Sequence, residues 1–167
     1  MNESLLEEFD YDAWANRLWA TALTDAKGVL GPESLIRLNS QGPWPDFFIG
    51  DAHVRAGEVF VHILWAQRTW LSRCGGVVTF ESADPEEWIG KLNAKWKEIL
   101  ASRPATDEIS YRNNMGIPGC RTLGQIARHV INHGTYHRGQ LREIAEYLNL
   151  ANIPGTDLVG FHMLQDA

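Results

Sequence analysis

The sequence predicts an all-α protein that folds as a four-helix bundle. Four long stretches place apolar residues at helical spacing, helix-start signals precede them, and segments rich in glycine and proline separate them. The chain has 167 residues, enough to bury a hydrophobic core, and its length is typical of one domain covering residues 1–167. Such bundles hold metal sites in their core, on the side chains of facing helices.

The first predicted helix begins at Ser4, where Ser4 and Glu7 form a capping box, and it ends near Gly28 or Gly31. Asn16 lies on the same side as the apolar positions of this helix. It is therefore either a buried amide that bridges helices or a site residue, and the bridging role is favoured. Residues 31–50 are rich in glycine and proline and are predicted to form a connection without regular structure.

The second predicted helix begins near Asp51 and ends at Gly75–Gly76, with His62 on its inward face. The third begins at Asp84, which can cap it ahead of a proline, and ends at Arg103–Pro104. The third helix shows an apolar stripe and a solvated face, and no chemistry is predicted for it.

A short hairpin or extended loop is predicted for residues 105–121, because apolar residues alternate there around a turn-rich centre. Thr122 and Gln125 then form another capping box, which starts the fourth helix and carries it to Leu148. The segment after Asn149 holds enough apolar side chains to pack on the bundle.

The fourth helix carries His129, His133 and His137, each four residues from the next. A four-residue step returns close to the same face about 6 Å farther along, so two adjacent imidazoles can bind one divalent ion. A drift of about 40° per step prevents all three from facing one ion equally. Spacing alone leaves open which pair binds, and whether these histidines are merely core or surface residues.

His62 would complete a site of three neutral imidazoles with two histidines of the fourth helix. Such a site leaves a divalent ion its full charge and open coordination positions, as in reactive rather than structural sites. Zinc or nickel is favoured, with iron or manganese as alternatives. His53 and His162 are weaker candidates. Glu58 either orients an imidazole or is an exposed helix glutamate, and the second role is favoured.

The composition and charge exclude several classes of protein. The net charge of −6 argues against a nucleic-acid partner, which needs a basic face. No apolar run approaches the roughly 20 residues of a membrane span. The acidic N-terminus lacks the features of a signal peptide, so a cytoplasmic location is predicted. Cys74 and Cys120 form no C-x-x-C pair, and core or loop roles are favoured for them over a catalytic thiol.

Three stretches of the sequence resemble a known family. They are YDAWANRLW at 11–19, HILWAQRTWLSR at 62–73 and HVINHGTYHRGQL at 129–141, followed by a P-x-x-D motif. The chain resembles the DinB/YfiT-like family of metal-binding four-helix-bundle proteins. The resemblance implies that His62, His133 and His137 hold the metal. It also implies long crossover connections between the helices and a homodimer.

The resemblance further implies a metal-dependent thiol S-transferase or hydrolase that acts on a small molecule, with a low-molecular-weight thiol such as bacillithiol or mycothiol. The catalytic group would be a metal-bound water or thiolate, and Trp14, Trp19 and Trp65 are candidates for an apolar pocket wall. A non-catalytic metal-binding or stress-response module, with a structural or sensory ion, is the alternative. A bundle without metal is a third and less favoured hypothesis.

Two positions near the expected ligands bear on these hypotheses. Gln67 stands where close relatives often carry an aspartate, which puts a carboxylate role there in doubt. Arg138 either contacts an anionic substrate or forms a salt bridge within the bundle, and the salt bridge is favoured. Because metal binding needs neutral imidazoles, the sequence also predicts that affinity falls as the pH drops through about 6.5.

Overall fold

The computed structural model describes residues 2–25, 30, 32–40 and 51–166. In this part of the chain the fold is mostly helical, which confirms the predicted class. The elements are α1 (Glu3–Asp25), α2 (Pro32–Asn39), α3 (Ala52–Arg73), α4 (Pro85–Ser102), β1 (Glu108–Arg112), β2 (Pro118–Thr122), α5 (Leu123–Tyr147) and α6 (Leu158–Gln165). None of the described helices is long and apolar enough to cross a membrane.

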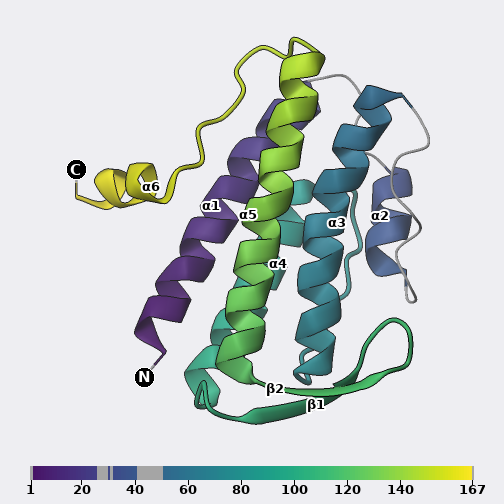
Figure 1. Ribbon diagram of the computed structural model, residues 1–167. Coiled ribbons are helices and arrows are strands. Elements are labelled where there is room, and N and C mark those ends of the chain that lie inside the picture. The colour runs from purple at the N-terminus through teal and green to yellow at the C-terminus, as the bar shows by residue number, and fades with distance from the viewer. Residues whose placement is uncertain (1, 26–29, 31, 41–50, 167) are drawn as a thin grey trace.

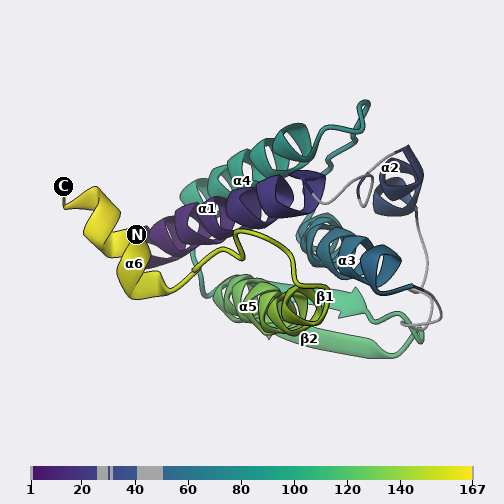
Figure 2. The same cartoon turned by 90° about the horizontal axis from the view of Figure 1, so that it is seen from above.

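The four long helices lie side by side and form the body of the molecule (Figures 1 and 2). The helix α1 packs against α4 and α5, and α3 packs against the same two helices. The short helix α2 lies on the outer side of α3, and the two strands cross below the ends of α3 and α5 (Figure 1). This arrangement brings the middle of α3 against the middle of α5.

Apolar side chains from all four long helices form one core. Its largest fully buried members include Phe9 and Trp19 of α1, Trp88 and Trp96 of α4, and Phe60 of α3. The Phe9 and Trp96 rings stack with their centroids 5.0 Å apart and so tie α1 to α4. Each such burial stabilises the fold by about 1.5–3 kcal/mol or more. The four long helices therefore share one large core.

The helix starts at Asp51, Asp84 and Thr122 are confirmed. Asp51 and Asp84 each accept a backbone hydrogen bond from the residue two positions on, and Thr122 forms a reciprocal capping box with Gln125. The helix α1 begins at Glu3, so Ser4 lies inside it rather than capping it. The predicted end of the first helix near residues 28–31 falls largely outside the described residues.

The prediction that residues 31–50 hold no regular structure is wrong for their first part, which forms α2. Pro32 provides a fixed φ at the first helical position, and Glu33 suits the positive end of the helix dipole. Leu38 is fully buried and Leu35 packs against the core. The glycine and proline content concealed this short amphipathic helix. Residues 41–50 lie outside the described part of the chain.

The predicted hairpin is confirmed as the antiparallel pair β1 and β2, with a register from Glu108↔Thr122 to Arg112↔Pro118. In its turn, the Asn113 side chain accepts hydrogen bonds from two backbone N–H groups, and Gly116 has a φ of +77° that favours glycine. The pairing holds Asn113 and its neighbour Asn114 beside the last turns of α3, where Asn114 bonds Arg73.

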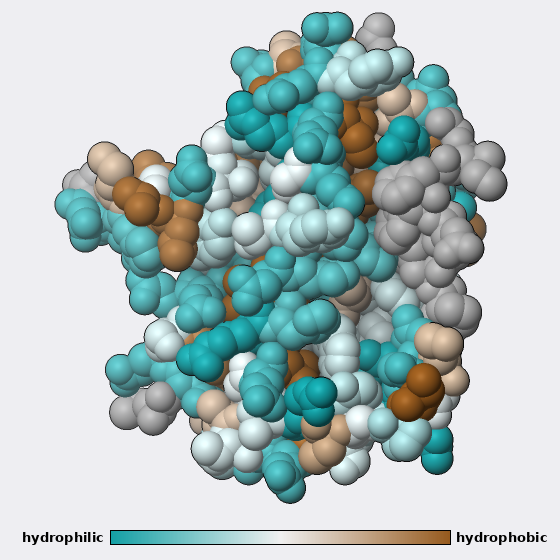
Figure 3. Space-filling view, in the orientation of Figure 1, coloured by the Kyte–Doolittle hydropathy of each residue, from teal (hydrophilic) through white to brown (hydrophobic). Residues whose placement is uncertain are grey.

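The C-terminal segment packs on the body at several points, as predicted: Leu150 and Ile153 pack against the core, and the Tyr11 hydroxyl donates to the carbonyl oxygen of Thr156. Phe161 of α6 is buried against Tyr11 of α1, with ring centroids 5.8 Å apart. The rest of α6 projects away from the long helices, and its apolar side chains form a patch on the surface (Figure 3). The exposed members are Leu158, Val159, Met163 and Leu164.

Candidate metal site

Three histidines from α3 and α5 meet where these two helices pack together. The Nε2 atom of His133 lies 3.2 Å from Nε2 of His62 and 3.2 Å from Nε2 of His137. One ligand atom from each residue falls within 4.8 Å of the others. His62 and His137 are buried and His133 is half-buried. The structure thus brings together the three residues that the family resemblance selects.

The donor set fits a divalent ion. A neutral imidazole Nε2 offers either one proton or one lone pair, so His133 cannot form good hydrogen bonds to both neighbours at once. One shared ion would use the lone pairs of all three nitrogens. Two tetrahedral zinc ligands at about 2.0–2.1 Å from the ion lie about 3.3 Å apart, close to the spacing of 3.2 Å found here.

Gln140 fixes the tautomer of one of these rings. Its amide Oε1 lies 2.7 Å from Nδ1 of His137, and its Nε2 donates to the Tyr136 hydroxyl at 3.2 Å. Because an amide oxygen only accepts, Nδ1 of His137 carries the proton and the Nε2 lone pair faces the other two rings. No role was predicted for Gln140, although its position three residues after His137 on a helix was a usable signal.

Burial favours the neutral form of all three histidines in the cluster. Burial lowers the pKa of His62 to about 3, and the nearby rings of His133 and His137 add to the effect. Burial and the neighbouring histidines lower the pKa of His133 to about 4. Burial also lowers the pKa of His137, against a smaller raising effect of Gln140. Neutral imidazoles are the form that binds metal, so the cluster is ready to bind at pH 7.

Because His62 and His133 of the folded protein take up protons only near pH 3–4, metal affinity should fall at a lower pH than the 6.5 suggested by the sequence. The same shifts make the unfolding free energy of metal-free protein depend on pH. The pKa values of His62 and His133 in the folded protein lie below the value of about 6.5 in the unfolded chain. The unfolding free energy is therefore highest above about pH 6.5 and falls as the pH drops toward 4. Metal-free protein should lose on the order of 2–4 kcal/mol of unfolding free energy between pH 7 and pH 5. Denaturant titrations of wild type and His62→Gln measure this slope, which should be shallower in the variant. A wild-type unfolding free energy that does not change between pH 7 and pH 5 would contradict this prediction.

His129 lies outside the cluster. It is exposed, and its ring packs edge-on against Trp70 with centroids 5.2 Å apart. His53 lies in the exposed first turn of α3, and His162 lies on the surface 3.4 Å from Glu7. None of these three rings belongs to the group of histidines that could hold one ion.

A buried polar network holds α1, α3 and α5 together beside the histidines. Arg138 donates to Asp12 at 2.6 Å and to Asn16 at 2.9 Å, and Gln67 donates to the other Asp12 oxygen at 2.5 Å. All four side chains are buried. The salt-bridge role of Arg138 and the bridging role of Asn16 are thereby confirmed. Asp12 itself was missed, although it lies one helical turn before Asn16.

This network explains the amide at position 67. An aspartate there would face the Asp12 carboxylate as a like charge in the protein interior, whereas Gln67 donates to it. Gly134 lets the network form, because a Cβ at this position would meet Asp12 Oδ1 at 2.8 Å and Arg138 Nη1 at 3.0 Å. Glutamine at position 67 and glycine at position 134 thus both suit the close contact of α3 and α5 with Asp12 of α1.

Two other sequence expectations change in the structure. Glu58 was expected to be an exposed helix glutamate, but it is half-buried and pairs with Arg37 of α2 at 3.1 Å. Of the three tryptophans expected in a pocket wall, only Trp65 lies there among the described residues, with its ring 5.7 Å from that of His62. Trp19 is buried in the core, and Trp14 packs against Phe161.

The histidines open to a cavity of about 340 Å³. Its described lining includes His62 and His133, the rings of Trp65 and Trp70, and Arg73. In the part of the chain that the structure describes, the group of metal-ligand side chains consists of three histidines without a fourth carboxylate or thiol. Cys74 is buried, and burial raises the pKa of its thiol to about 11. This layout is typical of an ion that has a position left for a substrate.

Comparison with known families bears on this geometry. The model of the DinB family matches residues 49–151, more than half of the chain. The chain belongs to the DinB family. The DinB match runs from the start of α3 to just beyond α5, and so includes His62, His133 and His137. No curated protein and no solved structure matches the chain.

Gln140 allows a direct test of how the ring of His137 is oriented. Substitution of Gln140 by Leu should weaken zinc or nickel binding by about 10- to 100-fold, because outer partners fix the tautomer and raise the basicity of ligating imidazoles. Competition with a chromophoric chelator measures the affinity. Gln125→Leu is the matched control, since Gln125 only caps the far end of the same helix. Equal losses in both variants would contradict the role given to Gln140.

Proposed function

We propose that this DinB-family protein binds one divalent metal ion through His62, His133 and His137 and acts as a metal-dependent enzyme on a small molecule. The thiol S-transferase or hydrolase type is the reaction class that we favour. The observation that carries the proposal is the meeting of three neutral Nε2 atoms beside a cavity. Zinc or nickel is the favoured metal, with iron or manganese as alternatives.

The chemistry of the site would be divided between the ion and the protein. A divalent ion with three neutral ligands supplies Lewis acidity and lowers the pKa of a water or thiol that binds it. The rings of Trp65 and Trp70 give the cavity an apolar wall, and Gln140 holds one ligand in its binding tautomer. The network of Asp12 and Arg138 keeps α1 and α5 together next to the site.

The wider fold and assembly belong to the same proposal. We infer a single DinB-type four-helix bundle over residues 1–167, in which the segments that contain α2 and the hairpin serve as long crossover connections. The exposed apolar side chains of α6 support a homodimer, since a second copy could cover them. A small-molecule partner, the absence of nucleic-acid and membrane partners, and a cytoplasmic location stay predictions from the sequence.

A non-catalytic metal-binding module is the second candidate. It is favoured by the described lining of the histidine cavity, which contains no aspartate or glutamate that could act as a general acid or base. In that case the ion would stabilise the contact of α3 with α5 or report metal availability.

An activity assay separates the two functions. Protein purified without a histidine tag and loaded with zinc or nickel should contain one ion per chain by elemental analysis. The loaded protein is then assayed for loss of a chlorinated or epoxide substrate with glutathione, bacillithiol or mycothiol. Metal-dependent turnover supports the enzyme, and one bound ion without turnover across the panel supports the module. Well under one ion per chain would overturn both.

A further inference from the structure

The histidine cavity continues into a second pocket along α3. The second pocket has a volume of about 510 Å³ and shares Thr69, Arg73, Asn113 and Asn114 with the first. His62, Thr69 and Arg73 follow one another at helical spacing and so lie along one face of α3. From His62 to Arg73 this face extends roughly 16 Å. The two pockets therefore form one groove, which is long enough for a molecule of tripeptide size.

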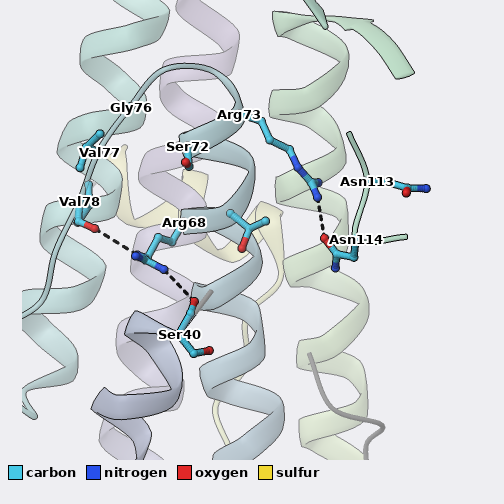
Figure 4. A pocket seen from close by; sticks show the side chains of 10 residues that line it. Ser40, Arg68, Ser72, Arg73, Gly76, Val77, Val78, Asn113 and Asn114 are labelled. Carbon is cyan, nitrogen blue, oxygen red and sulfur yellow. Dashed lines mark hydrogen bonds between the residues drawn. The ribbon is translucent and has the colours of Figure 1, made fainter. Parts of the chain in front are cut away.

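Two cations, Arg68 and Arg73, line the second pocket of the groove, and Arg73 also lines the histidine cavity. Figure 4 shows Arg68 extending toward Val78 and Ser40, and Arg73 extending in the other direction toward Asn114. The two guanidinium groups thus flank the pocket from opposite sides. The lining of both pockets, as far as the structure describes it, contains no aspartate or glutamate. In a chain of net charge −6, this groove is a local positive region.

Neutral partners hold both guanidinium groups in place. Arg68 donates through Nε and Nη1 to the carbonyl oxygens of Val78, Leu38 and Ser40, at 3.2–3.3 Å. Arg73 donates through Nη2 to Asn114 at 2.7 Å and lies over the Trp70 ring at 4.3 Å from its centroid. Within residues 2–25, 30, 32–40 and 51–166, neither arginine forms an ion pair.

These contacts leave donors for a ligand. Among the described contacts, Nη2 of Arg68 and both Nε and Nη1 of Arg73 have no hydrogen-bond acceptor. Both side chains are half-buried, where a charge interacts more strongly than in open water. A carboxylate is the complementary group, because its two oxygens match the planar fork of a guanidinium.

We propose that the groove binds a small molecule with a carboxylate at the Arg68 and Arg73 end and its reacting group at the histidine end. This inference rests on the proposed function, because the histidines mark the reacting end. It adds a specificity site that the metal cluster does not provide. The groove would therefore select anionic small molecules as substrates. A cysteine-derived thiol with a free carboxylate is one member of this class.

Glutathione and its diethyl ester are suitable probes, because they share a thiol and differ in their carboxylates. Calorimetric titration of zinc-loaded protein at fixed ionic strength should show about tenfold tighter binding of glutathione. Arg68→Gln and Arg73→Gln should each remove most of this preference and leave diester binding unchanged. Arg68→Lys and Arg73→Lys, which keep the charge, should recover part of it. Melting curves confirm that each variant is folded.

Arg142→Gln is the matched control, because it removes the same charge from the exposed face of α5, where Arg142 pairs with Glu146. It should leave the preference for glutathione intact. The proposal is overturned if wild type does not prefer glutathione over the diester, or if Arg142→Gln weakens glutathione as much as the groove variants do.

A thiol-free probe separates this proposal from the metal site. S-methylglutathione keeps both carboxylates and is titrated into metal-free protein. If the protein binds no ion but Arg68→Gln and Arg73→Gln still weaken this probe, the anion site stands and the metal proposal falls. If ions bind at one per chain and the arginine variants have no effect on either carboxylate probe, the metal site stands and the anion site falls.

Discussion

Alanine in place of His62, His133 or His137 is expected to lower the affinity for zinc or nickel by about 100-fold or more. Each substitution removes one of only three ligands in the described cluster, and loss of an outer partner alone already costs about 10- to 100-fold. His129→Ala should change the affinity less than about threefold, because its ring packs against Trp70 outside the cluster. Chelator competition measures all four affinities.

Circular dichroism of the same four variants provides the control for folding. All four should keep the helical spectrum of the wild type, because the core tryptophans and Phe60 are buried independently of the histidines. Bound metal should raise the melting temperature of wild type and His129→Ala by mass action. If His129→Ala abolishes binding while His137→Ala retains it, the earlier pair of α5 holds the ion and our assignment is wrong.

Methionine in place of Arg138 is expected to lower the unfolding free energy by about 3–5 kcal/mol, because it leaves the Asp12 carboxylate buried without its cation. Both side chains are only 2% exposed, and the atoms Arg138 Nη1 and Asp12 Oδ1 lie 2.6 Å apart. Denaturant unfolding monitored by circular dichroism gives the free energy. The double variant Asp12→Leu/Arg138→Met should recover part of the loss, since no unpaired charge then stays buried.

Arg142→Met is the control for this second prediction. The Arg142–Glu146 pair has a similar length of 2.9 Å, but its side chains are 57% and 54% exposed. Its loss should cost less than about 1 kcal/mol, as for other surface ion pairs. Equal costs for Arg138→Met and Arg142→Met would show that the buried network does not hold the helices together.

The sequence predicted those features that depend on neighbours in the chain. The capping at Asp84 and Thr122 involves residues two or three positions apart, and the shared face of His133 and His137 follows from helix geometry. Interactions between residues so close in the chain do not depend on how the helices pack. The short helix α2 was missed because its few apolar positions gain their helical stability mainly from burial against α3.

The charged network shows the limit of such reasoning. Asn16 and Arg138 were given structural roles from general rules on buried amides and bundles, but their common partner Asp12 was not found. Asp12 and Arg138 are 126 positions apart, and their contact requires the glycine at position 134 and the rotation that α1 adopts against α5. Periodicity gives the inward face of a helix, but it does not give the residue opposite.

The sequence by itself determined that the chain is helical, where three of its long helices start, and that histidines recur on one face of the last long helix. The family resemblance pointed to His62, and the tertiary structure shows that it meets His133, 71 positions later in the chain, at 3.2 Å. The tertiary structure alone decided that His129 turns toward Trp70 and that two arginines flank a groove. The physical reason is the range of the interactions. Hydrogen bonds within a helical turn are set by adjacent residues, whereas the axial position and rotation of packed helices are set by the whole core at once.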